Sequence, residues 1–279
     1  MIYSFELYIN YLDAKYSIYS DIRYELAKKH GFDFDRRSKI DFINDFKQNS
    51  NDEIYPDINP KLILKNHGSI EVNGKKMVPL SAISNSLSVL SNESGYWPVY
   101  HNDSNGFANL KYQNNGYEIL LIGDSFGEGY SVMQKDNISS NLIKSGISTY
   151  NISNAGNGPL IQYATIKEYC GIIEPKYIIW TYYMNDISDL NEELKHPILK
   201  KYLNEDNFSQ NLLKNKKMID NVLRKKLNEK IENHNVNRKP KSKTGKSVVS
   251  ILKLYSIRKR LGLINSEPNI NKTLDTFDE

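Results

Sequence analysis

Between residues 117 and 182, short continuous apolar runs alternate with longer stretches in which apolar residues recur every three or four positions. The run Ile119–Ile122, which ends at Gly123, is typical of a strand buried on both faces, as in a parallel sheet. The pattern predicts a strand at 119–122, a helix at 137–145, a strand at 149–152, a helix at 159–173 and a strand at 177–182. The short connections between these elements indicate parallel strands joined by right-handed crossovers.

The flanking segments have different patterns. Aromatic residues at steps of three to five predict a helix over 2–30, and a shorter helix is expected over 37–48. Residues 49–116 contain four prolines and many Asn, Ser and Gly, so we expect an irregular segment that packs on the later domain. After residue 190 helical spacing resumes, with a polar linker at 233–245. The predicted organisation is an N-terminal helical segment (1–50), an irregular lead-in (51–116) and an α/β core (117–279) with a basic helical insertion (190–262).

Length and composition narrow the choice of class. A chain of 279 residues can form one large domain or two small ones. Cys170 is the only cysteine, which excludes an internal disulfide and a cysteine zinc cluster. We expect neither a signal peptide nor a membrane span, because the start lacks a basic and apolar leader and no apolar run reaches about 18 residues. The compartment, bacterial cytoplasm or envelope, stays open.

The net charge of +4 is unevenly distributed. Residues 195–260 hold 19 Lys or Arg against 5 Asp or Glu, whereas the remainder holds 18 against 28. The first interpretation of this basic segment is a solvated charged face. The alternative is that it binds an anionic glycan or a membrane surface. We do not expect nucleic acid as a partner, because few aromatic residues are interleaved with the lysines.

Polar clusters follow each of the three predicted strands. They are Gly123–Gly129, Asn154–Pro159 and Tyr183–Asp186. In an open parallel sheet, ligands bind outside the carboxyl ends of the strands. We therefore expect these clusters to meet at one edge of the sheet and to form the functional site.

Ser125 lies at a predicted strand-to-helix turn, where a hydroxyl can be exposed as a nucleophile. The oxyanion that such a nucleophile creates needs donors, and the N–H groups of Ser125 and Gly156 and the side-chain amide of Asn185 can supply them. Taken singly, these residues are more often a helix cap (Ser125), a turn glycine (Gly156) and a loop or cap residue (Asn185). Their joint occurrence after three successive strands favours the site. The predicted substrate-binding residues are Asp124, Asn157 and Asp186, of which Asp124 is also expected to order the turn.

The stretch 117–190 resembles the SGNH/GDSL hydrolase superfamily. Ile119–Gly129, Tyr150–Pro159 and Asn185-Asp186 resemble its first three sequence blocks. In that resemblance Ser125 matches the nucleophile, and Gly156 and Asn185 match the oxyanion donors. The segments 97–107 and 207–212 look like a bacterial branch associated with surface-polysaccharide gene clusters.

The resemblance implies an α/β fold of the flavodoxin-like kind, a three-layer αβα arrangement around a parallel sheet, here incomplete at the C-terminus and with added helices. It also implies hydrolysis or transfer of an ester, commonly an acetyl ester on a carbohydrate. The implied partner is therefore an acylated carbohydrate or another small ester, and no cofactor is required.

The fourth block of the family, Asp-x-x-His, has no counterpart here, because none of the five histidines follows an Asp by three residues. Glu193-x-x-His196 is nearest in form but comes too soon after Asn185. Without a base the Ser125 hydroxyl is not activated, so we expect a weak or inactive enzyme. The favoured explanation is a truncated form of an active enzyme. The alternative is a complete, non-catalytic module that binds a carbohydrate or a protein partner.

Nucleotide and metal sites are disfavoured. Gly127-x-Gly129 lacks the third glycine of the dinucleotide-binding motif, and Gly245-Lys246-Ser247 lacks the first glycine of a phosphate-binding loop. The sequence has no His-x-x-x-His and no tight group of Asp residues, so we expect no metal.

Overall fold

The computed structural model describes residues 19–60, 68–109 and 116–237. Two compact units are distinguished: residues 39–230 form one, and the residues up to 38 and from 231 onward form the other. In the second unit, helix α2 (Tyr19–Lys29) is the described part of the helix predicted over 2–30. It ends just before Gly31, whose φ of 74° stops the helix.

The unit 39–230 begins with helix α3 (Lys39–Asn49), close to the prediction for 37–48. The lead-in that follows was predicted to be irregular, and this is wrong in part, because it contains five strands of three residues each. They are β1 (Ile54–Pro56), β2 (Ile70–Val72), β3 (Lys75–Met77), β4 (Leu87–Val89) and β5 (Val99–His101). They form a β1-β4-β5 sheet and an antiparallel β2-β3 hairpin. Strands this short do not produce a recognisable alternation of apolar and polar residues.

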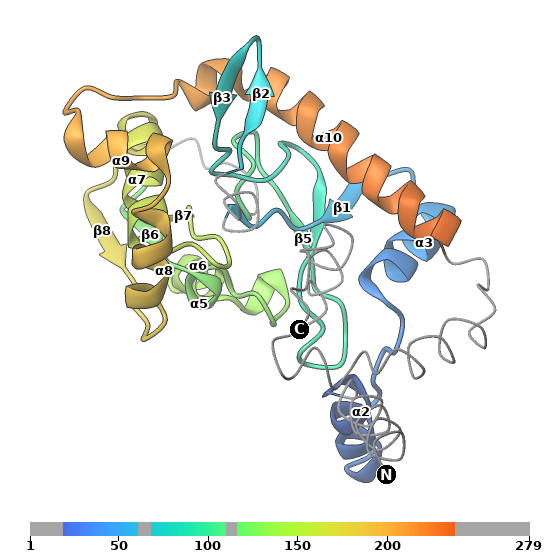
Figure 1. The fold of residues 1–279 in the computed structure, drawn as a ribbon. Helices are drawn as coiled ribbons and strands as arrows, with labels where there is room; N and C mark the ends of the chain where they lie inside the picture. The colour runs from blue at the N-terminus through green and yellow to red at the C-terminus, as the bar shows by residue number, and fades with distance from the viewer. Residues whose placement is uncertain (1–18, 61–67, 110–115, 238–279) are drawn as a thin grey trace, which may run out of the picture. The chain divides into compact units, whose positions relative to one another are not determined.

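The α/β part follows the predicted order of elements. It comprises β6 (Ile119–Ile122), α5 (Ser125–Glu128), the 3-10 turn η2 (Gln134–Asp136), α6 (Ile138–Lys144), β7 (Thr149–Asn151), α7 (Pro159–Ile173) and β8 (Tyr177–Trp180). The sheet order is β7-β6-β8, and β6 is parallel to both neighbours. The α/β class and the parallel sheet are therefore confirmed (Figure 1).

The main core joins the lead-in to one face of this sheet. Leu120 and Ile122 of β6 contribute to it, together with Leu160 and Ile161 of α7. Lead-in residues share the same cluster, among them Ile58, Ile70, Leu80, Ile83 and Phe107. The lead-in is thus part of the core of the unit 39–230 and completes the burial of β6 and α7.

Three helices follow the sheet: α8 (Asp186–Glu193), α9 (Pro197–Asn204) and α10 (Leu212–Asn237). The helical spacing of Leu212, Ile219 and Leu223 is confirmed, and all three side chains are buried. The polar linker predicted at 233–245 is wrong at its start, because α10 continues to Asn237. The helix predicted over 248–261 lies outside the described residues.

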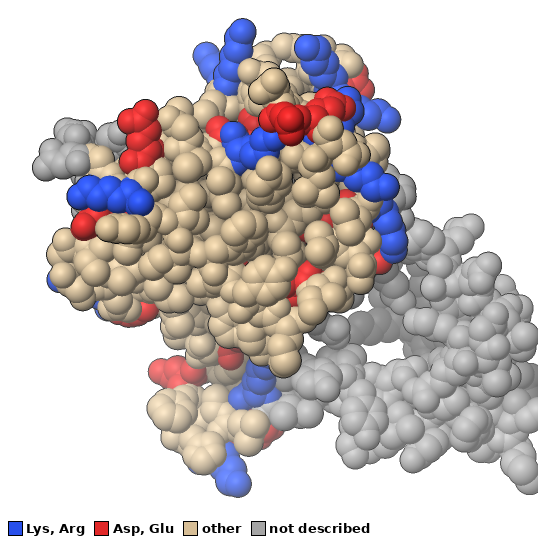
Figure 2. Space-filling view, turned by 90° about the vertical axis from the view of Figure 1, so that its left-hand side faces the viewer, with Lys and Arg blue, Asp and Glu red and all other residues tan. Residues whose placement is uncertain are grey.

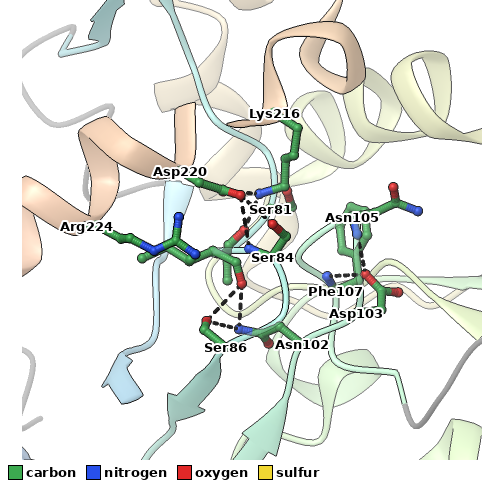
Figure 3. A network of polar contacts seen from close by, with 12 residues as sticks. Ser81, Ser84, Ser86, Asn102, Asp103, Asn105, Phe107, Lys216, Asp220 and Arg224 are labelled. Atoms are coloured by element: carbon green, nitrogen blue, oxygen red, sulfur yellow. Dashed lines mark hydrogen bonds and ion pairs between the residues drawn. The ribbon is translucent and has the colours of Figure 1, made fainter. Parts of the chain in front are cut away.

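Helix α10 is attached to the lead-in by buried polar contacts (Figure 3). Lys216 Nζ donates to the carbonyl of Ala82 at 2.6 Å and pairs with Asp220, which in turn accepts a hydrogen bond from the Ser84 hydroxyl. Burial lowers the pKa of the Lys216 ammonium. The solvated face expected for the basic segment is therefore wrong for Lys216.

Strand β8 is exposed along its whole length, in contrast to β6. Its four residues, Tyr177 to Trp180, are between 39% and 66% exposed, and Met184 and Ile187 beyond it are more exposed still. Among the described strands β8 pairs only with β6. Figure 2, which shows the β8 side of the molecule, has a broad central area without Lys, Arg, Asp or Glu. An apolar strand edge of this kind is unusual on a protein surface.

Candidate functional site

The loops that follow β6, β7 and β8 touch one another at the carboxyl edge of the sheet. The Phe126 and Tyr183 rings lie 4.5 Å apart, which joins the loops after β6 and β8. A Cβ on Gly127 would come within 2.5 Å of the Ser153 hydroxyl, which joins the loops after β6 and β7. The structure thus brings the three sequence clusters together, as the topology predicts.

Ser125 is the first residue of α5 and is half-buried. The Asp124 carboxylate caps this short helix by accepting the Phe126 N–H at 2.9 Å, which confirms the expected ordering of the turn. Gly129, at φ 85°, ends the turn, and its N–H donates to the Ser125 carbonyl at 3.0 Å. No described residue hydrogen-bonds to the Ser125 hydroxyl. The hydroxyl is therefore available to an external group.

A buried carboxylate ties α5 to the loop after β7. Glu128 Oε2 accepts the Ala155 N–H at 2.8 Å, immediately before Gly156. Burial, and then the neighbouring Asp57 carboxylate, raises the pKa of Glu128 to about 8. Asn151 adds a second link, because its side-chain amide donates to the Gly127 carbonyl at 2.8 Å. The relative position of Ser125 and Gly156 is thus fixed from within the protein.

Gly156 occupies a position that a side chain could not share. Its φ is 73°, and a Cβ there would lie within 2.7 Å of Asn59 Oδ1. The Asn59 amide of the lead-in therefore lies directly against this glycine. The neighbouring Asn157 has no exposed surface, and neither Nδ2 nor Oδ1 of its side chain has a hydrogen-bond partner among the described residues.

Asn185 immediately precedes α8, and its amide Nδ2 donates to Asp189 Oδ2 at 3.1 Å. Asp186 has no exposed surface. One carboxylate oxygen accepts the Tyr183 N–H at 2.6 Å, and no residue in the described part of the chain hydrogen-bonds to the other. Burial raises the pKa of Asp186, and the carboxylates of Asp124 and Asp189 add to the effect. Of the predicted substrate-binding residues, Asp124, Asn157 and Asp186 are therefore all buried.

Glu193 was singled out in the sequence only as the companion of His196, and the structure gives it a different position. Its carboxylate accepts the N–H groups of Gly158, Leu160 and Ile161 at 2.6, 2.9 and 3.3 Å, at the start of α7. It thereby holds the end of the loop that carries Gly156. The sequence also did not indicate the roles of Glu128 and Asn59. Each contacts one residue that is distant in the sequence, and such a contact produces no recognisable spacing of residues.

The described histidines are not bonded to Ser125. His196 precedes α9, is buried, and its Nε2 lies 3.0 Å from the carbonyl oxygen of Gly68. His30, His101 and His234 lie elsewhere in the described structure, and His67 is outside it.

The described residues contain no group of three or more His, Cys, Asp or Glu side chains arranged to hold a metal ion. None of the helices placed in the structure combines the length and the apolar character needed to cross a membrane.

Comparison with protein-family models, with curated proteins and with solved structures found no match for this chain.

Removing the Glu193 carboxylate is expected to destabilise the fold. Glu193→Ala leaves three buried N–H groups without an acceptor, and we expect the free energy of unfolding to fall by about 2–3 kcal/mol. Urea unfolding followed by circular dichroism measures this loss. Glu192→Ala, one residue away and exposed, is the control and should change stability by less than about 0.5 kcal/mol. Equal stability of the two variants would show that the Glu193 contacts do not hold α7.

Proposed function

We propose that this chain is an ester hydrolase or acyl-transfer protein of the SGNH type, built on a flavodoxin-like three-layer fold, with Ser125 as the nucleophile. One observation carries the proposal. Ser125 is half-buried, and its hydroxyl has no hydrogen-bond partner among the described residues. The residue lies on a tight turn after the central strand β6, and the loops after β7 and β8 both contact that turn. A serine nucleophile needs this combination of access and surrounding donors.

In the proposed reaction, Ser125 Oγ attacks the acyl carbonyl carbon and its proton passes to hydroxide, which becomes water. The bond between the acyl carbon and the alkoxy oxygen then breaks, and the leaving alkoxide takes a proton from water. A second water or an acceptor alcohol attacks the acyl-serine and gives its proton to hydroxide, and Ser125 Oγ leaves and takes up a proton from water. The N–H groups of Ser125 and Gly156 and the Asn185 amide are the proposed oxyanion donors. The Asn185 amide has two hydrogens, so its bond to Asp189 leaves one for the oxyanion.

The proposed substrate is a neutral acyl ester, such as an acetyl ester on a carbohydrate. The carboxylates of Asp124 and Asp189 each act on the charge of Asp186. A carboxylate-bearing acyl group would meet like charge there and be rejected. Because the described residues place no imidazole on Ser125, the rate is expected to stay within the roughly 10³–10⁴-fold over water that an oxyanion hole and binding provide.

Acyl transfer to Ser125 is the test. Incubation with p-nitrophenyl acetate at rising pH should acetylate Ser125, because hydroxide then replaces the missing base, and mass spectrometry of the peptides locates the acetyl group. Ser125→Ala should abolish this acetylation, whereas Ser145→Ala, at an exposed position, should leave it unchanged. Acetylation of Ser125 no faster than that of exposed serines would exclude it as a nucleophile. Rapid turnover at neutral pH that Ser125→Ala abolishes would contradict the proposed lack of a base.

A second candidate is a non-catalytic module that binds a carbohydrate or a protein partner on the same scaffold. The contact of the Asn59 amide with Gly156 favours it, because a side chain there competes with an oxyanion for the glycine. This candidate predicts binding of an acetylated glycan without acetylation of Ser125 at any pH.

A further inference from the structure

A groove outside the Ser125 site is lined by lysines. It has a volume of about 590 Å³ and lies between the β2-β3 hairpin, α9 and the start of α10. Ligand sites in proteins commonly have volumes of roughly 300–1,000 Å³. None of its lining residues belongs to the three loops that surround Ser125.

The charge of the groove has one sign. Lys75, Lys76, Lys201 and Lys214 line it, and no Asp or Glu does. None of the four ammonium groups forms an ion pair with a described residue. Lys201 instead lies over the Phe208 ring, 5.3 Å from its centroid. Glu71 lies opposite Lys76 across the β2-β3 hairpin, but no acidic side chain lines the groove, and its four ammonium groups together favour an anionic ligand.

Neutral groups in the groove narrow the class of ligand. Asn211 and Asn215 donate through Nδ2 to the backbone carbonyls of Ser209 and Asn211. Their side-chain carbonyl oxygens accept no hydrogen bond from a described residue, so they are available to hydroxyl donors. Phe208 adds one half-buried aromatic face. Acceptors for hydroxyls, an aromatic face and ammonium groups together suit an acidic sugar chain.

We propose that this groove binds a polyanionic glycan, with the lysines on its acidic groups and the Asn carbonyl oxygens on its hydroxyls. A single-stranded nucleic acid is the weaker fit, because Phe208 is the single aromatic residue of the groove and successive bases need several stacking faces. The inference goes beyond the proposed function, since binding here does not require Ser125.

The test is binding of polygalacturonate, a chain of uronic acids, to the full chain by isothermal titration calorimetry. We expect binding that weakens steeply as salt is added, and no binding of neutral dextran. The variant Lys201→Gln/Lys214→Gln should lose about tenfold in affinity. The matched control is Lys225→Gln/Lys226→Gln, which removes the same charge from exposed positions of α10 outside the groove and should lose less than about twofold.

Equal losses in the two double variants would overturn the proposal, because the attraction would then be a property of net charge. Tighter binding of single-stranded DNA or of anionic vesicles than of polygalacturonate, with the same dependence on Lys201 and Lys214, would also overturn it. Ser125→Ala should bind polygalacturonate like the parent chain, so failure of the esterase proposal and failure of this one are distinguishable.

Discussion

Replacing Lys39 with Met is expected to lower the free energy of unfolding by about 3–5 kcal/mol, because the change leaves a buried carboxylate without its counter-charge. Lys39 Nζ lies 2.6 Å from Asp57 Oδ1, and both side chains are 4% exposed. The Tyr130 hydroxyl donates to the other Asp57 oxygen at 2.8 Å. The Lys39 charge also favours ionisation of the buried Glu128, so its loss raises the pKa of that acid further and leaves Asp57 as the carboxylate without a counter-charge. Urea unfolding at neutral pH measures the loss.

A second substitution tests the cause. In Lys39→Met/Asp57→Asn most of the lost stability should return, because the amide still accepts the Tyr130 hydroxyl and carries no charge. The matched control is Lys195→Met, which removes an exposed ion pair with Glu192 and should cost less than about 1 kcal/mol. If Lys39→Met costs no more than Lys195→Met, the buried pair is not what joins α3 to the segment after β1.

As the pH rises, the free energy of unfolding of the parent chain is expected to fall further than that of the variant Glu128→Gln. The difference between the two losses should reach about 3–5 kcal/mol. Burial, followed by the charge of Asp57, raises the pKa of Glu128 from 4.5 to about 8. Between these values the folded chain keeps a proton that the unfolded chain has released, so stability falls as the pH rises through this window. Below it both states are protonated, and above it both are ionised, so the contribution is constant at each end.

Gln is the appropriate replacement because it imitates the protonated acid and can still accept the Ala155 N–H. Urea unfolding of both chains across the window gives two curves that should separate as the pH rises, with the variant the more stable at the alkaline end. Glu118→Gln, whose side chain is exposed, is the control and should follow the parent. Parallel curves for Glu128→Gln and the parent would show that the pKa of Glu128 is the same in the folded and the unfolded chain, and would contradict the prediction.

The α/β part of the fold could be predicted because its signals are local. The run Ile119–Ile122 is buried and central, as its continuous apolar character indicates, and Pro159 begins α7 as its fixed φ allows. The three-residue strands of the lead-in could not be predicted, because strands such as β1 and β4 are defined by a partner more than thirty positions away. The exposure of Tyr177–Trp180 could not be predicted either, because a continuous apolar run has the same sequence pattern in an exposed edge strand as in a buried strand.

The same contrast holds for the candidate site. The order of the strands predicts that Ser125 and Asn185 lie in loops at one edge of the sheet. The position of Asp124 before a turn predicts its capping role. Their partners do not follow, because each joins positions that are distant in the sequence and unmarked by any repeat. Glu128 beneath Ala155 and Asn59 against Gly156 are such contacts, and only the folded chain reveals them.

The attachment of α10 to the lead-in has a consequence for the order of events during synthesis. Gln210, Lys216 and Asp220 bond to residues 132, 134 and 136 positions earlier in the chain. A ribosome adds roughly 5–20 residues per second, so the lead-in emerges many seconds before these partners exist. Contacts between residues so far apart in the sequence are slow to form. Until they form, the apolar surface of the lead-in that packs on α10 stays exposed. We therefore expect α10 to close the unit 39–230 last, and chaperones that shelter apolar segments to act on the nascent lead-in before α10 has been made.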